Sequence, residues 1–203
     1  MGATRLKRNQ TKHAAEVLSR AFYNDPLMIY LIPDNKERKR KLPKLILKVV
    51  RYCRSFHTVE TDDNFNGVAC WLPPGSTGLK YGKKIMSGSL AVPFLLGFRG
   101  YKRFLKVMRV LDQLEAKHVP EPHWYLFMIG VDTGARGKGT GSKLIEAKFK
   151  EAEREGSQAA YYLETMNDKT LPLYKKLGFR VCETVTVENG ESHPLKIWAM
   201  KKD

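Results

Sequence analysis

The sequence predicts a single domain of the α+β class. Its 203 residues allow one substantial hydrophobic core and leave little room for a second. Apolar periodicity predicts helices and a strand hairpin in the first half of the chain, whereas residues 123–200 alternate between strands and helices around a glycine-rich loop. We therefore expect one domain over residues 1–203, with its chemistry in the C-terminal half.

The elements of the N-terminal half follow from capping residues, apolar periodicity and turns. Thr11 caps a first helix, and Asp25 with Pro26 ends it. The further elements are a basic helix over 36–54, hairpin strands over 59–61 and 67–72, and a helical insert over 79–117 that is broken near Pro93 and at 97–100.

The C-terminal half predicts strands separated by helices. Residues 124–131 are apolar at nearly every position, as expected of a central strand that is covered on both faces. The elements that follow are a loop over 136–141, a helix that ends at Gly156, a strand over 159–163, a short helix over 171–177, and hairpin strands over 180–187 and 193–200 joined by Asn189 and Gly190.

The chain is strongly basic, with 36 Lys and Arg residues against 21 Asp and Glu residues and a net charge of +15. Such a charge attracts anions, which include nucleic acids and phosphate-bearing cofactors. The basic residues are spread over several segments, and neither an RNP-like pattern nor a zinc-finger spacing accompanies them. Nucleic-acid binding is therefore permitted but not indicated.

Cysteine content and hydropathy predict the compartment. The three cysteines form no CxxC pair, which argues against a disulfide framework and against a metal site. The longest apolar run, residues 90–98, is too short to span a bilayer, and the N-terminal segment lacks the apolar stretch of a secretory signal. We expect a cytoplasmic protein with neither a membrane partner nor a metal.

A glycine-rich turn between a strand and a helix predicts an anion site. Its alternating glycines and adjacent cations are Arg136, Gly137, Lys138, Gly139 and Gly141. Glycines let the backbone approach a phosphate at the helix N-terminus, where unpaired N–H groups and the helix dipole favour negative charge. The loop is not a P-loop, because Thr140 stands where that motif needs lysine, and it misses the dinucleotide fingerprint, which needs glycine in place of Ser142.

The loop and a second motif resemble those of the GNAT acetyltransferases. The first motif, Arg-x-x-Gly-x-Gly, begins at Arg136 after a strand that ends in Val131. In the second, Asn167 lies seven residues before Tyr174, which opens a Tyr-x-x-x-Gly-Phe sequence. Residues 21–26 and 70–75 are similar to segments of the puromycin N-acetyltransferases within this family. The resemblance implies the GNAT fold, a mixed but mostly antiparallel central sheet flanked by helices, with a helical insert before the central strand.

The resemblance also implies how acetyl-CoA binds. Backbone N–H groups of the loop hold the pyrophosphate, the end of the central strand runs beside the pantetheine arm, and a freed N–H near Val131 binds the thioester oxygen. The implied cofactor-binding residues are Ile129, Gly130, Val131, Arg136, Gly137, Lys138, Gly139, Thr140, Gly141, Asn167 and Tyr174.

Acyl transfer to an amine needs a base for the amine and an acid for the departing thiolate. An alkylammonium with a pKa of about 10.4 is almost fully protonated at neutral pH. Tyr174 is implied as the general acid by its place in the motif. For the base, His123, Tyr125 and Glu164 stay open as alternatives, because the first two alternate onto one face of the central strand and the third ends the next strand.

These features predict an N-acetyltransferase that moves acetyl from acetyl-CoA to a primary amine, favouring a small molecule, by direct attack in a ternary complex. Three alternatives stay open: acceptors on protein lysines or N-termini, a basic nucleic-acid-binding module that uses the fold without catalysis, and a dinucleotide-binding enzyme. Because the chain is so basic, any acidic lining for a cationic amine must be local. We expect the insert over 79–117 to cover the acceptor side of the cleft.

Overall fold

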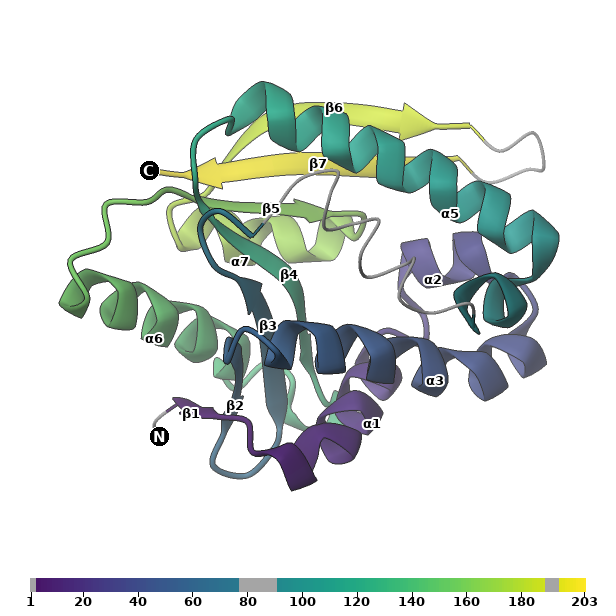
Figure 1. The fold of residues 1–203 in the computed structure, drawn as a ribbon, viewed down its shortest axis with the longest axis horizontal. Helices are drawn as coiled ribbons and strands as arrows, with labels where there is room; N and C mark the ends of the chain where they lie inside the picture. Colours follow the sequence, from purple (N-terminus) through teal and green to yellow (C-terminus); the bar gives the residue numbers. More distant parts are fainter. Residues whose placement is uncertain (1–2, 77–90, 189–193) are drawn as a thin grey trace.

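The structure is a computed structural model that describes residues 3–76, 91–188 and 194–203 (Figure 1). Its centre is a seven-stranded sheet with the strand order β1-β2-β3-β4-β5-β7-β6. The strands are β1 (Ala3–Arg5), β2 (Val59–Asp62), β3 (Gly67–Leu72), β4 (Trp124–Val131), β5 (Tyr161–Thr165), β6 (Arg180–Val187) and β7 (Leu195–Lys202). Neighbouring strands are antiparallel except for β4 and β5, which are parallel. The predicted α+β class with a mixed, mostly antiparallel sheet is confirmed.

Helices cover both faces of this sheet. One face carries α1 (Thr11–Ala21), α2 (Pro26–Leu31), α3 (Asn35–Arg54) and α5 (Ala91–His118), and the other carries α6 (Thr140–Arg154) and α7 (Leu171–Lys176). The short 3-10 helices are η1 (Arg8–Gln10), η2 (Thr133–Ala135) and η3 (Asp168–Thr170). In Figure 1, α5 runs along β6 and β7, while α3 lies against β2 and β3.

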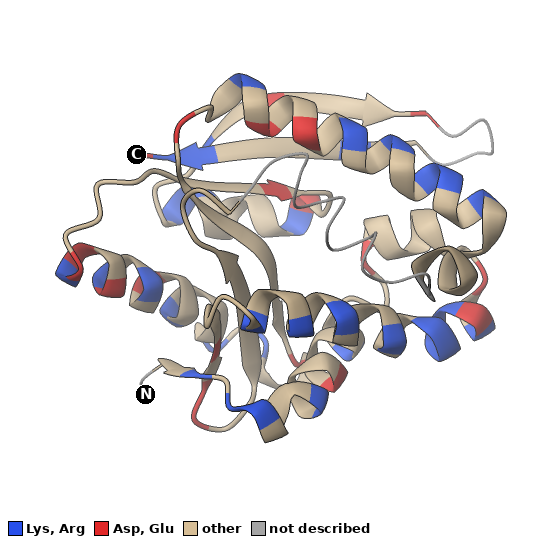
Figure 2. Cartoon of the chain, in the orientation of Figure 1, with Lys and Arg blue, Asp and Glu red and all other residues tan. Residues whose placement is uncertain are grey.

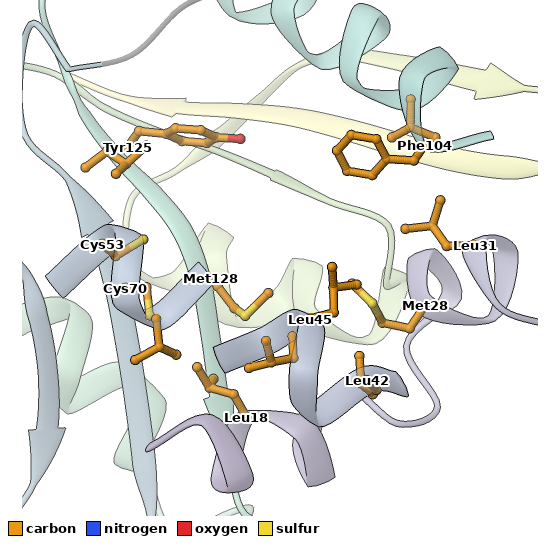
Figure 3. Packing of buried hydrophobic residues seen from close by; sticks show 14 of the residues in the cluster. Leu18, Met28, Leu31, Leu42, Leu45, Cys53, Cys70, Phe104, Tyr125 and Met128 are labelled. Atoms are coloured by element: carbon orange, nitrogen blue, oxygen red, sulfur yellow. The ribbon is translucent and has the colours of Figure 1, made fainter. Parts of the chain in front are cut away.

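Each face of the sheet has its own hydrophobic core. The larger core joins α1, α3 and α5 to the sheet and contains Leu18, Leu42 and Tyr125 (Figure 3). The second core lies under α6 and α7 and contains Trp71 and Leu126. Since Tyr125 and its neighbour Leu126 belong to different cores, β4 is covered on both faces, as its continuous apolar sequence predicts.

The N-terminal region differs from the prediction in three respects. The first helix begins at Thr11, but Gln10 occupies its N-cap position, and the helix ends at Ala21. Asp25 and Pro26 do not simply end this helix, since they start α2, a helix that the sequence analysis did not predict. The fixed φ of proline suits the first position of a helix, so the same dipeptide is also a start signal. Strand β1 was also not predicted, because three residues show no measurable alternation.

The helical insert is confirmed in its described part. Gly97 interrupts α5 with a φ of 69°, which is the predicted break. Pro93 does not break the helix, because it lies in the first turn of α5, where backbone N–H groups have no intrahelical partner to lose. The predictions for residues 79–90, for the Asn189 and Gly190 turn and for the position of His193 lie outside the described residues. Within the described ranges, no helix is long and apolar enough to cross a membrane.

Strand β5 begins and ends two residues later than predicted. The sequence analysis placed it over 159–163, because Ala159 and Ala160 extend the apolar run, but the pairing with β4 begins at Tyr161. The shift moves Glu164 from beyond the strand end to the strand interior. Since side chains alternate along a strand, Glu164 lies on the same face as Tyr162.

Candidate active site

Strands β4 and β5 pair only where they begin. The paired residues are Trp124 with Tyr161 and Tyr125 with Tyr162, and beyond them the two strands diverge (Figure 1). The divergence leaves the facing edges of β4 and β5 without ladder hydrogen bonds to each other. Unpaired strand edges are suited to binding an extended ligand arm through backbone groups.

A β-bulge bends β4 at the same place. Cys70 of β3 pairs with Met128 and Trp71 pairs with Leu126, so Phe127 is an extra residue on β4. A bulge increases the local twist and redirects the strand beyond it. The predicted oxyanion-binding N–H near Val131 lies on this redirected segment and stays a prediction.

The glycine loop lies at the end of β4 and has the conformation that an anion site requires. Gly137 and Gly139 have left-handed φ values of 78° and 77°, and Gly139 is the N-cap of α6. A Cβ placed on either glycine would meet no atom within 4 Å, so the loop is open on that side. Backbone N–H groups at the start of this 15-residue helix therefore fit an anionic group such as a pyrophosphate.

Two arginines attach the loop to the C-terminal end of α1. Arg136 donates from Nη2 to the carbonyl oxygen of Ala21 at 3.0 Å and from Nε to the carbonyl oxygen of Val131 at 3.3 Å. Arg20 donates from Nη2 to Asp132 Oδ2 at 2.5 Å. Arg136 thus has a positioning contact that the sequence did not predict.

Glycines also allow helices to approach the end of β4. A Cβ on Gly130 would lie 2.8 Å from Ala21 Cβ and 2.9 Å from Leu18 Cδ2, so Gly130 allows α1 to pack against β4. On the other face, a Cβ on Gly141 would lie 3.6 Å from Val131 Cγ2, which is ordinary contact. The first turn of α6 is therefore held close to the strand that precedes the loop.

The second motif is ordered by hydrogen bonds around η3. The Asn167 side chain caps η3 by accepting from the Lys169 N–H at 3.2 Å through Oδ1. Thr170 Oγ1 donates to the Asn167 carbonyl oxygen at 2.7 Å and lies 2.9 Å from Thr165 Oγ1 at the end of β5. Because Oδ1 is used in the cap, the Asn167 Nδ2 group is the donor that can serve the predicted contact with the cofactor arm.

Tyr174, the predicted general acid, lies on α7 and is 6% exposed. Its ring packs edge-on against Phe179, with a distance of 6.1 Å between the ring centroids. Burial and the negative charge of Asp25 raise the pKa of Tyr174, while a hydrogen bond with Thr170 acts in the opposite direction. The hydroxyl therefore keeps its proton at neutral pH, as a general acid must.

Asp25 is a candidate site residue that the sequence analysis did not identify. Its side chain accepts the Leu27 N–H at 2.9 Å and caps α2. Burial raises the pKa of Asp25 to about 6, although backbone hydrogen bonds from Leu27 and Met28 act in the opposite direction. The negative charge of this carboxylate in turn raises the pKa of the Tyr174 phenol. A partly buried carboxylate beside a candidate acid can accept a proton or bind an ammonium group.

The three residues considered as the general base, His123, Tyr125 and Glu164, lie together on the face of the sheet that α5 covers. Tyr125 donates from its hydroxyl to Glu164 Oε2 at 2.6 Å, and the Tyr125 and His123 ring centroids are 6.5 Å apart. Burial raises the pKa of Glu164 to about 8, against the effect of the Tyr125 hydrogen bond. Burial also lowers the pKa of His123, which is 2% exposed, and raises that of Tyr125. Glu164 is thus largely protonated at neutral pH in the free protein.

Comparison with known proteins gives the family. Residues 95–179 match the profile of the acetyltransferase (GNAT) family. An uncharacterized N-acetyltransferase of Schizosaccharomyces pombe is 30% identical over 207 residues, which span 97% of this chain and 82% of that protein.

Solved structures share the fold at lower sequence identity. The crystal structure from Corynebacterium glutamicum described as histone acetyltransferase HPA2 and related acetyltransferase superposes with a TM-score of 0.65 at 24% identity, covering 99% of this chain and 94% of that one. The polyamine N-acetyltransferase of Drosophila melanogaster superposes with a TM-score of 0.63 at 14% identity, covering 98% of this chain and 97% of that one. The chain belongs to the GNAT family and is an N-acetyltransferase.

Proposed function

We propose that this enzyme transfers acetyl from acetyl-CoA to a primary amine of a small molecule, by direct attack of the amine. GNAT enzymes use acetyl-CoA as co-substrate. The observation that carries the proposal is the electrostatic interaction between the Asp25 carboxylate and the Tyr174 phenol, which would offer one proton acceptor and one proton donor to the same reaction. The fold likeness to a polyamine N-acetyltransferase supports a small-molecule acceptor.

The cofactor site in this proposal consists of the glycine loop and the diverging strands. Backbone N–H groups from Arg136 to Gly141 would hold the pyrophosphate, with the exposed side chain of Lys138 adding positive charge. The free edge of β4 toward Val131 would bind the pantetheine arm, together with Asn167 Nδ2 from the opposite side.

Three proton transfers complete the reaction. Asp25 takes a proton from the acceptor ammonium, and the resulting amine nitrogen forms a bond to the acetyl carbon as the carbon–sulfur bond breaks. Tyr174 gives its proton to the departing thiolate, and the second proton lost by the attacking nitrogen restores the Tyr174 phenol, so that the products are a neutral amide and a free thiol. Asp25 is better suited as the base than Glu164, because a pKa of about 6 leaves Asp25 ionised at neutral pH, whereas a pKa of about 8 leaves Glu164 mostly protonated.

The acceptor side of the site is locally acidic although the protein is basic. Lys and Arg residues dominate α3 and extend along the outer surface of α5 (Figure 2). Asp25 lies at the N-cap of α2 and Glu164 within β5, and burial raises the pKa of both carboxyls. These two groups would supply the local acidic lining that a cationic amine requires in a chain with a net charge of +15.

The proposal is tested with purified enzyme, acetyl-CoA and a panel of arylalkylamines, aliphatic amines, polyamines and histone-tail peptides, with acetylated products detected by mass spectrometry. We expect a small amine to be acetylated with saturable kinetics. Asp25→Asn and Tyr174→Phe should lower kcat by about 10²-fold or more, as loss of a general base or acid does. Acetylation of peptides alone, or full activity of both variants, would overturn the proposal.

A further inference from the structure

The C-terminal end of α1 is bound to the residue that follows β4. Arg20, in the last turn of α1, donates to Asp132 Oδ2 from Nε at 3.0 Å and from Nη2 at 2.5 Å. The two residues are 112 positions apart in sequence. Two N–H groups of one planar guanidinium that point at the same carboxylate fix the orientation of both side chains. The ion pair therefore joins α1 to the segment that leads into the glycine loop.

Asp132 also holds the start of this segment through its backbone. Its N–H donates at 2.7 Å to the carbonyl oxygen of Asn66, in the turn between β2 and β3, and its carbonyl oxygen accepts the Ala135 N–H at 2.9 Å. Asp132 is the N-cap of η2, and Arg136, the first residue of the glycine loop, is the C-cap. The orientation of Asp132 thus determines where the loop leaves the sheet.

The loop itself returns to the same end of α1. Arg136 Nη2 donates at 3.0 Å to the carbonyl oxygen of Ala21, the last residue of α1. Ala21 also packs on β4, since a Cβ on Gly130 would lie 2.8 Å from Ala21 Cβ. The end of α1 therefore contacts the strand before the loop, the residue that follows this strand, and the loop. A helix that is held at all three places restricts the positions that the loop can adopt.

The ion pair is too exposed to matter mainly for folding stability. The Arg20 side chain is 49% exposed and the Asp132 side chain 27%, and ion pairs that water reaches contribute little to stability. The hydrogen bond from Arg20 lowers the pKa of Asp132, so the pair is ionised at neutral pH. A ligand that binds to a loop whose N–H groups are already oriented loses less free energy to ordering that loop. The expected effect of the pair is therefore on binding.

We propose that the ion pair between Arg20 and Asp132 positions the glycine loop for acetyl-CoA. The inference rests on the proposed cofactor site and adds two positioning residues that act through the backbone of residues 136–141. Charge alone would favour the opposite effect of Asp132, because a carboxylate beside an anion site repels the anion. The proposal therefore requires that the orientation of the loop outweighs this repulsion.

Asp132→Ala separates the effect of orientation from the effect of charge. The Asp132 side chain makes no capping hydrogen bond in η2, so alanine removes the ion pair and leaves the cap unchanged. Charge alone predicts tighter binding of acetyl-CoA, whereas loss of orientation predicts weaker binding. We expect calorimetric titration to give a Kd about tenfold higher than that of the wild type. Arg20→Met should weaken binding at least as much, the double variant should bind no more weakly than Arg20→Met, and Arg20→Lys should restore part of the affinity.

The matched control is Asp203→Ala. Asp203 forms an exposed ion pair of the same kind with Arg180, at 2.7 Å, and its removal changes the net charge by the same amount. We expect the control to bind acetyl-CoA as the wild type does. Both alanine variants should keep the Tm within about 3 °C of the wild type, because both pairs are exposed.

A second measurement follows the loop without any cofactor. Backbone order parameters from NMR relaxation should be about 0.85 for residues 137–141 in the wild type and in Asp203→Ala, and about 0.6 in Asp132→Ala. A loop that is equally ordered in all three proteins would overturn the proposal. Unchanged or tighter binding of acetyl-CoA by Asp132→Ala would overturn it as well, since the pair would then act only through its charge.

The calorimetric experiment uses no acceptor amine, so it fails separately from the proposed function. If no small amine is acetylated but Asp132→Ala binds acetyl-CoA more weakly than wild type and control, the positioning role stands and the acceptor assignment fails. If small amines are acetylated and Asp132→Ala binds acetyl-CoA normally, the proposed function stands and the positioning role fails. A wild-type protein that does not bind acetyl-CoA would overturn both.

Discussion

Asp25→Asn should stabilise the protein while it removes activity, because the native carboxylate is ionised in a partly buried position. Burial raises the pKa of Asp25 from 3.8 to about 6. A difference of about 2 pKa units corresponds to about 3 kcal/mol of folding stability that ionisation costs above pH 6. Asparagine has nearly the same shape and is an equally good N-cap residue, so the cap of α2 is kept.

The pH dependence has a definite sign. Since the folded-state pKa lies above the unfolded one, the cost is absent when Asp25 is protonated in both states and grows as the pH rises through the two values. The cost of ionising Asp25 in the wild type should be about 3 kcal/mol at pH 7.5, about half of that at pH 5 and below about 1 kcal/mol at pH 4. The asparagine amide is also partly buried, so about 2 kcal/mol is the expected gain at pH 7.5, or about 4–8 °C in Tm for a chain of this size.

The assay is thermal unfolding of both proteins from pH 4 to pH 7.5, with acetylation measured on the same samples. The matched control is Asp34→Asn, since Asp34 caps α3 by accepting the Glu37 N–H at 2.7 Å but is exposed to solvent. The control should change Tm by less than about 2 °C and leave turnover unaltered. An Asp25→Asn protein that melts at or below the wild-type temperature at pH 7.5, without dependence on pH, would refute the reasoning about burial.

Three further predictions address the loop, the acid and the core. Gly139→Ala and Gly156→Ala introduce the same backbone strain, because both glycines have φ values above 70° and open space around a new Cβ. Each substitution should lower the free energy of unfolding by about 1 kcal/mol. Only Gly139→Ala should weaken calorimetric binding of acetyl-CoA, and equal binding by both variants would contradict the loop assignment. Tyr174→Phe should lower kcat far more than it weakens acetyl-CoA binding, and kcat/KM of the wild type should fall as the pH drops below about 6 with protonation of Asp25. Lys148→Met should lower the free energy of unfolding, measured in urea, by about 3–5 kcal/mol. The reason is that the buried Glu60 carboxylate, whose Oε1 lies 2.5 Å from Lys148 Nζ, loses its counter-ion. Adding Glu60→Gln should restore most of this loss of stability.

The glycine loop and the elements around it were predictable because their signals are local. An apolar run, alternating glycines and an amphipathic pattern follow one another within about thirty residues, and each pattern predicts the backbone conformation of the segment in which it occurs. The loop conformation at Gly137 and Gly139 confirms this part of the prediction. Helix α2 was missed because Asp25 with Pro26 is compatible both with a helix end and with a helix start, and only the packing of the following apolar residues selects the start.

The proposed acid–base residues were less predictable because their properties arise from distant contacts. His123, Tyr125 and Glu164 were identified as alternatives from strand periodicity, but the hydrogen bond between Tyr125 and Glu164 depends on the register of β4 with β5, which the sequence does not show. Asp25 and Tyr174 are 149 residues apart in sequence, and no local pattern indicates the electrostatic interaction between them. From the sequence, Asp25 was interpreted only as part of a helix stop. Its raised pKa follows from burial, which only the assembled fold supplies.

In the proposed reaction, the charge distribution would allow one basic protein to bind two substrates of opposite charge. Long-range attraction depends on the net charge, so the basic surfaces of α3 and α5 favour the approach of an anionic cofactor and oppose that of a cationic amine (Figure 2). Short-range binding depends instead on local groups in a medium of lower effective dielectric constant, where a carboxylate acts more strongly than it does in water. Burial of Asp25 and Glu164 therefore raises the cost of ionising each carboxyl alone and strengthens its interaction with an ammonium group once one is bound. Added salt should consequently weaken acetyl-CoA association and affect the retention of a bound amine much less, since exposed charges are screened more than enclosed ones.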